Sequence, residues 1–210
     1  MPKNEDGCIS PKLTKKIKIS DDTYIFRFSF SDENMVLGLP IGKHVVFSTT
    51  IDGELCERKY TPISAITQKG YVDFVIKIYK AGVHPKFPEG GKMSQYVDKM
   101  AIGDIMLMEG PKGRLQYEGH GNFTIAKKAV TKKTLIGCIS GGTGITPCYQ
   151  VIQASLKNLD GCKCSLIFGN RTTSDILLKD ELMAFADNYK ENFNLYLTVD
   201  IQPDASENWK

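Results

Sequence analysis

The chain contains 210 residues, of which 41% are hydrophobic and 24% charged, and its formal net charge at pH 7 is +3. This composition is typical of a globular protein, and the length is sufficient for two modest cores. The small positive charge argues against nucleic-acid binding, and no apolar run approaches the about 20 residues of a membrane span. We therefore expect a soluble, cytoplasmic protein without a membrane segment, a prediction compatible with membrane association through a partner.

Cysteines and histidines are the first candidates for a metal site. The six cysteines show no C-x-x-C spacing, and His44, His84 and His120 stand far apart and away from them. This pattern favours free thiols in a reducing compartment over a disulfide framework. We expect no metal site.

The first half of the chain, to about residue 126, alternates apolar and polar residues with a period of two. The segments 23–30 (TYIFRFSF), 44–51 (HVVFSTTI) and 71–79 (YVDFVIKIY) are rich in β-branched and aromatic residues, and Asp52-Gly53 has the sequence of a hairpin turn. At least six such strands predict a small closed antiparallel barrel. One helix is expected at 92–100, where apolar residues follow helical spacing.

The second half alternates strands with helices. Apolar strands are expected at 134–140, 163–169 and 193–199, with helices at 146–159 and 174–189. Thr146 is the expected N-cap of the first helix and Pro147 its first residue. This order predicts parallel βαβ units. We place the boundary in the lysine-rich segment 127–133, which gives domains of residues 1–127 and 133–210.

The stretch SGGTGITP, residues 140–147, joins a predicted strand to a predicted helix. Free backbone N–H groups and the positive end of the helix dipole meet at such a turn, which suits a phosphate group. The stretch lacks the third glycine of the G-x-G-x-x-G fingerprint, and the only acid at a suitable distance is Asp160, in a later turn. An ordinary tight turn is the alternative interpretation.

Two further features lie in the predicted barrel. Arg58 and Tyr60 alternate onto one face of a strand, where they could hold a phosphate and a flat ring of one ligand. Gly90 and Gly91 precede the helix and would expose a second set of helix N-terminal amides. A surface arginine and a core tyrosine are the simpler interpretation of either side chain alone.

Three motifs taken together resemble a known family. RKYTPIS (58–64), GGKMSQY (90–96) and GGTGITP (141–147) are similar to the flavin, diphosphate and nicotinamide-nucleotide motifs of the NADH-cytochrome b5 reductase branch of the ferredoxin-NADP reductase superfamily. The segments LGLPIGKHV (37–45) and SDILLKDEL (174–182) also fit. The resemblance extends from about residue 13 to residue 200.

The resemblance implies an antiparallel six-stranded FAD-binding barrel followed by a parallel-sheet NADH-binding α/β domain. In such a protein a hydride passes from NADH to the flavin, and single electrons then pass to cytochrome b5 or a similar haem acceptor. Thr23, near the flavin N5, and Lys77 are the implied catalytic residues. The implied cofactor-binding residues are Arg58, Lys59, Tyr60, Thr61, Val75, Lys77, Tyr79, Gly91, Lys92, Met93 and Ser94 for FAD, and Gly142, Thr143, Gly144, Thr146 and Asp200 in the second domain.

Further expectations concern cofactor choice and partners. Asp200 matches the acid that receives the adenosine ribose hydroxyls in the family, and its charge would repel a 2′-phosphate, which favours NADH over NADPH. Surface lysines of the barrel would attract an acidic cytochrome b5. We expect a monomer that binds no nucleic acid.

Relatives in this family continue beyond the strand that precedes Asp200, to a C-G-P-P-P-M motif, and none of the six cysteines here is followed by Gly-Pro. The resemblance therefore implies a second domain that is incomplete at its C-terminus. The alternative function is a truncated flavin-binding or partner-binding module with little NADH turnover. An FMN-containing reductase of an oxygenase system fits less well, because the Gly90-Gly91 loop is present and an iron–sulfur cysteine run is absent.

Overall fold

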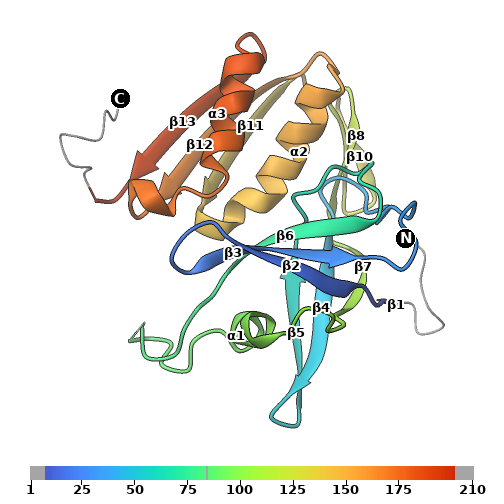
Figure 1. Cartoon of the computed structure of the whole chain (residues 1–210). Helices are drawn as coiled ribbons and strands as arrows, with labels where there is room; N and C mark the ends of the chain where they lie inside the picture. The colour runs from blue at the N-terminus through green and yellow to red at the C-terminus, as the bar shows by residue number, and fades with distance from the viewer. Residues whose placement is uncertain (1–7, 84, 202–210) are drawn as a thin grey trace. The chain divides into compact units, whose positions relative to one another are not determined.

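The computed structural model describes residues 8–83 and 85–201. His84 therefore lies outside the described residues. The chain divides into two compact units, residues 1–116 and 117–210, each of which is described by itself below (Figure 1). The expected limits of 1–127 and 133–210 stay a prediction.

The first unit is built from antiparallel strands. One sheet has the order β1-β7-β4-β5 and the other has the order β2-β3-β6. Backbone hydrogen bonds join the two sheets at two edges: Leu13 N donates to Asp104 O at 2.8 Å, and Ile63 N donates to Asp73 O at 2.9 Å. The strands are β1 (Cys8–Ile9), β2 (Lys12–Lys18), β3 (Thr23–Ser29), β4 (His44–Ile51), β5 (Glu54–Tyr60), β6 (Tyr71–Lys77) and β7 (Leu107–Lys112). The predicted antiparallel architecture is confirmed.

Alternation along the strands creates the core of this unit. Phe28 of β3, Phe47 of β4 and Phe74 of β6 are fully buried. Their rings meet edge to face, with centroids 5.6 Å apart for Phe28 and Phe47 and 4.9 Å apart for Phe47 and Phe74, an arrangement that aromatic quadrupoles favour. The β4–β5 hairpin turns at Asp52 and Gly53, both with positive φ, as its sequence predicts.

Helix α1 (Lys92–Lys99) also lies where the sequence predicts it. Met93 and Val97, four residues apart, are buried, and Met100 ends the helix as a third buried residue. This spacing places all three side chains on the face that packs on the core. Gly91 is the N-cap residue, so the glycine pair stands at the helix N-terminus as expected.

The second unit begins inside a small antiparallel sheet that the sequence did not indicate. Its order is β10-β9-β8, from β8 (Leu115–Gly119), β9 (Asn122–Ile125) and β10 (Lys128–Val130). The turn between β9 and β10 consists of Ala126 and Lys127, with φ of 51° and 67°. Positive φ at both positions is typical of a two-residue hairpin. The usual glycine or asparagine is absent, so the segment resembled a plain connector.

The larger sheet of this unit is parallel, with the order β11-β12-β13, which confirms the predicted topology. It consists of β11 (Leu135–Gly141), β12 (Lys163–Asn170) and β13 (Phe193–Val199). Helices α2 (Ile145–Lys157) and α3 (Lys179–Asn188) lie on the same side of it (Figure 1). Leu166 and Phe168 of β12 are fully buried, whereas Ile167 between them is 47% exposed.

Two helix starts differ from the prediction. A 3₁₀ turn, η1 (Gly142–Gly144), runs directly into α2, so Gly144 is its N-cap and Thr146 is already inside the first turn. The assignment of Thr146 as N-cap was therefore wrong. Helix α3 begins at Lys179 instead of residue 174, because Thr172 and Asp175 form a capping box that closes a separate turn, η2 (Thr173–Asp175). Leu178 then has a φ of 56°, which interrupts any continuous helix.

Candidate functional site

The predicted site residues form one group in each unit. The first group lies on β3, β5, β6 and the N-terminus of α1, and the second lies at the carboxyl ends of the parallel strands. We describe each group separately.

Thr23 and Lys77 face each other across the antiparallel pair of β3 and β6, where the register pairs one directly with the other. Thr23 is fully buried. Between them lies Asp22, which sequence reasoning missed: its Oδ2 is 3.0 Å from the Lys77 ammonium, and its Oδ1 accepts a hydrogen bond of 3.0 Å from the Thr23 hydroxyl. The structure thus brings together the two predicted catalytic side chains through a carboxylate.

The electrostatics of this cluster favour the ionised carboxylate. Burial by itself raises the pKa of Asp22, but hydrogen bonds from Lys77, Thr23 and Ser20 outweigh it and hold this pKa below its ordinary value. The Asp22 carboxylate is therefore charged at neutral pH, beside the buried Thr23 hydroxyl. The adjacent motif DDT offered a signal for Asp22, because a residue that directly precedes a predicted catalytic threonine lies at the same strand end.

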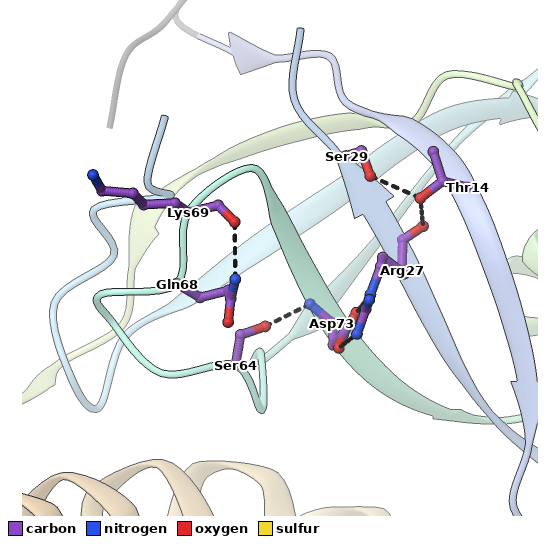
Figure 2. Close-up of polar contacts among 7 residues, drawn as sticks. All are labelled: Thr14, Arg27, Ser29, Ser64, Gln68, Lys69 and Asp73. Carbon is purple, nitrogen blue, oxygen red and sulfur yellow. Dashed lines mark hydrogen bonds and ion pairs between the residues drawn. The ribbon is translucent and has the colours of Figure 1, made fainter. Parts of the chain in front are cut away.

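A second ion pair fixes the same two strands farther along. The Arg27 guanidinium of β3 forms two hydrogen bonds of 2.8 Å with the Asp73 carboxylate of β6 (Figure 2). The guanidinium also lies 3.6 Å from the centroid of the Tyr71 ring. Both charged side chains are largely buried, and a bidentate pair of this kind restrains the relative position of the strands. The register that opposes Thr23 to Lys77 is thereby held in place.

The end of β5 carries the flavin-motif residues. Tyr60 packs on Phe47 with ring centroids 4.5 Å apart, and its burial, opposed by the charge of Arg58, raises the pKa of Tyr60 to about 12. Tyr60 is therefore a neutral hydrogen-bond donor at physiological pH. Arg58 is exposed and donates only to the neighbouring Glu57 carbonyl, at 2.7 Å, with no ion pair among the described side chains. Its guanidinium is available to an anion.

The remaining members of this stretch are less specific. Alternation places Lys59 on the opposite face of β5 from Arg58 and Tyr60. Thr61 follows the strand and is partly buried. Val75 is buried in β6, whereas Tyr79, two residues beyond its end, is 52% exposed. The structure does not bring Lys59 and Arg58 to one face.

The glycine loop before α1 is shaped by close backbone contacts. A Cβ at Gly90, where φ is +67°, would overlap the Tyr79 carbonyl, and one at Gly91 would lie 2.6 Å from the Ser94 hydroxyl. Ser94 accepts a hydrogen bond of 3.1 Å from Tyr79 N and donates one of 3.0 Å to Gly91 O. No side chain caps α1, so its first amides are directed at this loop. Such a cradle suits a diphosphate.

Met93 and Lys92, two other predicted residues of α1, differ in how exposed their side chains are. The Met93 side chain is buried, so only its backbone is able to contact a ligand. The Lys92 ammonium lies 3.4 Å from Glu54 in an exposed pair, which contributes little to stability and leaves the lysine free to reorient.

The second group surrounds the start of α2. Gly142, Thr143 and Gly144 form the turn η1, and Thr146 donates to Thr143 O at 3.3 Å. A Cβ at Gly142 or Gly144 would meet no atom within 4 Å, so open space lies over the loop. Asp200 follows β13 in an exposed bend and donates its N–H to the Asn170 carbonyl at 3.0 Å.

Two polar side chains at this edge were not predicted. Ser140 is the last residue but one of β11, and Asn170 is the last residue of the neighbouring strand β12. Their buried side-chain atoms have no hydrogen-bond partner in the described part of the chain. Buried polar groups are normally satisfied, and ligands of open α/β sheets bind at the carboxyl ends of the strands. These groups therefore fit a ligand such as a nucleotide. Asn170, directly after the apolar run LIFG, was the available sequence signal.

Asp160 is engaged elsewhere, as its position in a turn suggested. Its carboxylate accepts hydrogen bonds from the Tyr117 hydroxyl, from Ser155 at 2.9 Å and from Cys162 N at 3.1 Å. These hydrogen bonds join β8 to the end of α2. Residues 8–83 and 85–201 contain no cluster of three or more potential metal ligands, and none of their helices has the length and apolar character required to cross a membrane.

Comparison with known proteins identifies the family of each half of the chain. The family of oxidoreductase FAD-binding domains matches residues 10–117, and the family of oxidoreductase NAD-binding domains matches residues 138–210. The crystal structure of the cytochrome b5 reductase domain of Ulva prolifera nitrate reductase superimposes with a TM-score of 0.89 and 40% identity, over 99% of this chain and 78% of that one. The chain belongs to the cytochrome b5 reductase family.

Curated members of the family show the same relationship. NADH-cytochrome b5 reductase 1 of Homo sapiens is 47% identical in an alignment of 200 positions that covers 91% of this chain and 65% of the human protein. Nitrate reductase [NADH] 2 of Nicotiana tabacum is 45% identical in an alignment of 211 positions that covers 100% of this chain and 23% of the tobacco protein. The chain thus spans less than two thirds of the length of each. At the level of the family, the predicted cofactors FAD and NADH are confirmed.

Proposed function

We propose that the chain is an FAD-dependent oxidoreductase that accepts a hydride from NADH and passes single electrons to cytochrome b5 or another haem acceptor. The observation that carries this proposal is that FAD-binding and NAD-binding families match consecutive parts of one chain. We assign FAD to the barrel, residues 1–127, and NADH to the α/β domain, residues 133–210. FAD, when bound, supplies the redox chemistry, and the protein supplies orientation and electrostatics.

In the barrel, we assign the diphosphate of FAD to Arg58 and the amides at the start of α1. Arg58 is exposed and has no acidic partner in the described structure, and the Gly90-Gly91 loop leaves no room for side chains. Tyr60 is held against Phe47 and offers a flat, neutral ring to the flavin. Thr61 directly follows Tyr60 after the end of β5 and belongs to the same proposed site. Lys59, Val75, Tyr79, Lys92, Met93 and Ser94 complete this proposed FAD site.

Thr23 and Lys77 are the proposed catalytic residues. They lie opposite each other at one end of β3 and β6. The Lys77 ammonium has three N–H groups, so it is able to donate to a reduced, negatively charged ring while it pairs with Asp22. The single proton of the Thr23 hydroxyl is directed at Asp22, so Thr23 would act by packing and by orienting that carboxylate. Thr23 is buried, and the Tyr60 ring packs on Phe47. Because both side chains are held in place, they would need little rearrangement when the flavin binds.

In the α/β domain, we assign the nicotinamide dinucleotide to the carboxyl edge of the parallel sheet. Gly142, Thr143 and Gly144 would contact its diphosphate, Thr146 belongs to the same proposed cofactor-binding group, and Asp200 would accept hydrogen bonds from the adenosine ribose. The unpartnered side chains of Ser140 and Asn170 support this assignment. The human relative is named as a reductase of cytochrome b5, which supports a haem protein as the acceptor.

The decisive test is the spectrum of the purified protein, followed by stopped-flow mixing with NADH. We expect a yellow protein whose flavin absorbance is bleached by NADH, and which then reduces cytochrome b5 as well as ferricyanide. A yellow protein that NADH does not bleach would support a flavin-binding or partner-binding module with little turnover. A colourless protein that takes up no FAD would overturn both. Extraction of the flavin distinguishes FAD from FMN.

A further inference from the structure

Asp22 occupies the last position before β3 and makes contacts with both of its oxygens. Oδ2 lies 3.0 Å from the Lys77 ammonium. Oδ1 accepts hydrogen bonds from Thr23 at 3.0 Å and from Ser20 at 3.4 Å. One carboxylate therefore contacts both proposed catalytic side chains.

The backbone around Asp22 fixes where this carboxylate lies. Its carbonyl accepts a hydrogen bond of 2.6 Å from Ile78 N, directly after Lys77, and Thr23 O accepts one of 3.0 Å from Ile19 N. Both ends of the contact, the turn before β3 and the end of β6, are thus joined by main-chain bonds. The proximity of Asp22 and Lys77 is a consequence of strand register, not of two long side chains that meet by chance.

We propose that Asp22 is a positioning residue that holds the Lys77 ammonium and limits how much of its positive charge acts on the flavin. This inference rests on the proposed function. A carboxylate 3.0 Å from the ammonium cancels much of its field at a more distant group. Lys77 alone would stabilise the added negative charge of reduced flavin, and Asp22 reduces that stabilisation. The reduction potential of the flavin is therefore set by the pair.

Exposure bounds the size of the effect. The side chains of Lys77 and Asp22 are 30% and 35% exposed, so solvent partly screens the pair and its contribution to stability is small. Hydrogen bonds from Lys77, Thr23 and Ser20 keep the carboxylate charged despite its burial, because together they lower the pKa of Asp22. The charge is thus present at neutral pH, and its removal is a defined perturbation.

The test compares Asp22→Asn with Asp21→Asn in the FAD-loaded protein. Asn has the shape of Asp and still offers an oxygen to Thr23, but it carries no charge. Asp21 is the matched control, because it is the adjacent residue and is fully exposed. Its carboxylate pairs with the exposed Lys18 at 3.2 Å. Both variants lose one negative charge, so a difference between them reports position.

The measured quantity is the ratio of reduced to oxidised flavin in equilibrium with a redox dye, poised at the midpoint of the unmodified protein. We expect this ratio to rise about three- to tenfold in Asp22→Asn and by less than about twofold in Asp21→Asn. A tenfold change corresponds to about 30 mV for a two-electron couple. Equal ratios in the two variants would overturn the inference.

A double variant tests whether Asp22 acts through Lys77. If it does, Asp22→Asn should change the ratio less in a Lys77→Met background than in the unmodified protein. An undiminished change would show that Asp22 acts on the flavin directly and would contradict the positioning role. Asp22→Glu, which keeps the charge, should restore the ratio to within about twofold of the original.

Loss of FAD from a variant is also decisive. If Asp22→Asn does not retain FAD, Asp22→Ser repeats the charge removal with a smaller side chain, and the same ratios are expected. If neither variant retains FAD while Asp21→Asn does, Asp22 has a structural role and the inference fails. An unmodified protein that takes up no FAD overturns the proposed function as well. A yellow, NADH-bleached protein with equal variants overturns only the role of Asp22.

Discussion

The Ser64 hydroxyl accepts a hydrogen bond of 2.6 Å from the backbone N–H of Asp73 (Figure 2). Ile63 N donates to the carbonyl of the same Asp73 at 2.9 Å. The turn that follows Tyr60 is therefore fastened to β6, the strand that ends at Lys77. The final serine of the RKYTPIS motif thus links two parts of the proposed flavin site.

Ser64→Ala should lower stability by about 1–3 kcal/mol, because it leaves the partly buried Asp73 N–H without its acceptor. Thermal unfolding followed by fluorescence should show a melting temperature lower by several degrees, with faster loss of FAD. Ser29 is the matched control: its hydroxyl makes an exposed contact of 2.8 Å with Thr14, also drawn in Figure 2. Ser29→Ala should change the melting temperature little. Equal shifts would contradict the linking role of Ser64.

Arg58→Ala should weaken FAD retention more than NADH affinity. Its guanidinium has no ion pair among the described residues, and a charge-assisted hydrogen bond to a phosphate contributes about 1.5–3 kcal/mol. We expect the dissociation constant of FAD, measured by fluorescence recovery, to rise at least tenfold.

Arg58→Lys keeps the charge but not the planar fork, so it should restore only part of the FAD affinity. Arg114→Ala, in the exposed turn between β7 and β8, is the control for loss of one positive charge and should retain FAD normally. Proportionate losses of FAD and NADH affinity in Arg58→Ala would remove Arg58 from the FAD site.

Asp200→Ala should reduce the preference for NADH over NADPH. Asp200 is exposed at the carboxyl end of β13, and its backbone is anchored to Asn170, so the carboxylate keeps a defined place and repels a 2′-phosphate. Steady-state kinetics should show a fall of about tenfold in the ratio of kcat/KM for NADH to that for NADPH, equivalent to about 1.4 kcal/mol. The exposed Glu191 is the control, and Glu191→Ala should leave the ratio as it is.

Asp160→Asn should destabilise the second unit in a pH-dependent manner. Burial raises the pKa of Asp160, but hydrogen bonds from Tyr117, Ser155 and Cys162 outweigh it and lower this pKa below its ordinary value. A depressed folded-state pKa contributes stability above the unfolded pKa of about 4, and that contribution is lost as the pH falls through the lower folded value.

We therefore expect Asp160→Asn to lower the free energy of unfolding by about 2–4 kcal/mol at pH 7. The difference in this free energy between the variant and the unmodified protein should shrink below about pH 4. Denaturant titrations at several pH values measure this difference. Asp187→Asn, at an exposed position of α3, should have little effect at any of them. A difference for Asp160→Asn that is constant with pH would show that its carboxylate is not the stabilising species.

Much of the fold followed from local patterns. The alternation that buries Phe28 and Phe74, the Asp52-Gly53 turn and the spacing of Met93 and Val97 are properties of neighbouring residues, and they predicted strands, hairpin and helix correctly. The failures occurred where the backbone departs from the usual sequence signals. The Ala126-Lys127 turn lacks glycine, and Leu178 adopts a left-handed conformation inside an apolar stretch.

The candidate site likewise contains residues that local patterns predicted and residues that they missed. The motif residues Arg58, Tyr60, Gly90 and Gly91 could be named from the sequence, because strand period and helix N-termini place them on known faces. Asp22 and Asn170 could not be assigned a role from the sequence. The role of Asp22 depends on its contact with Lys77, and that of Asn170 depends on the burial of a side chain that has no hydrogen-bond partner among the described residues. Lys77 is 55 residues from Asp22 by sequence number, and only the antiparallel register brings them to 3.0 Å.

The sequence by itself determined that an antiparallel β unit precedes an α/β unit, where the three ligand motifs lie and which family the chain resembles. All of these depend on periodicity and on short runs of residues. Only the tertiary structure decided which charges meet, which polar groups are buried without a partner in the described part of the chain, and where α2 and α3 begin. These properties depend on strand register and on competition between side chains for the same backbone groups, and neither is encoded in a local stretch.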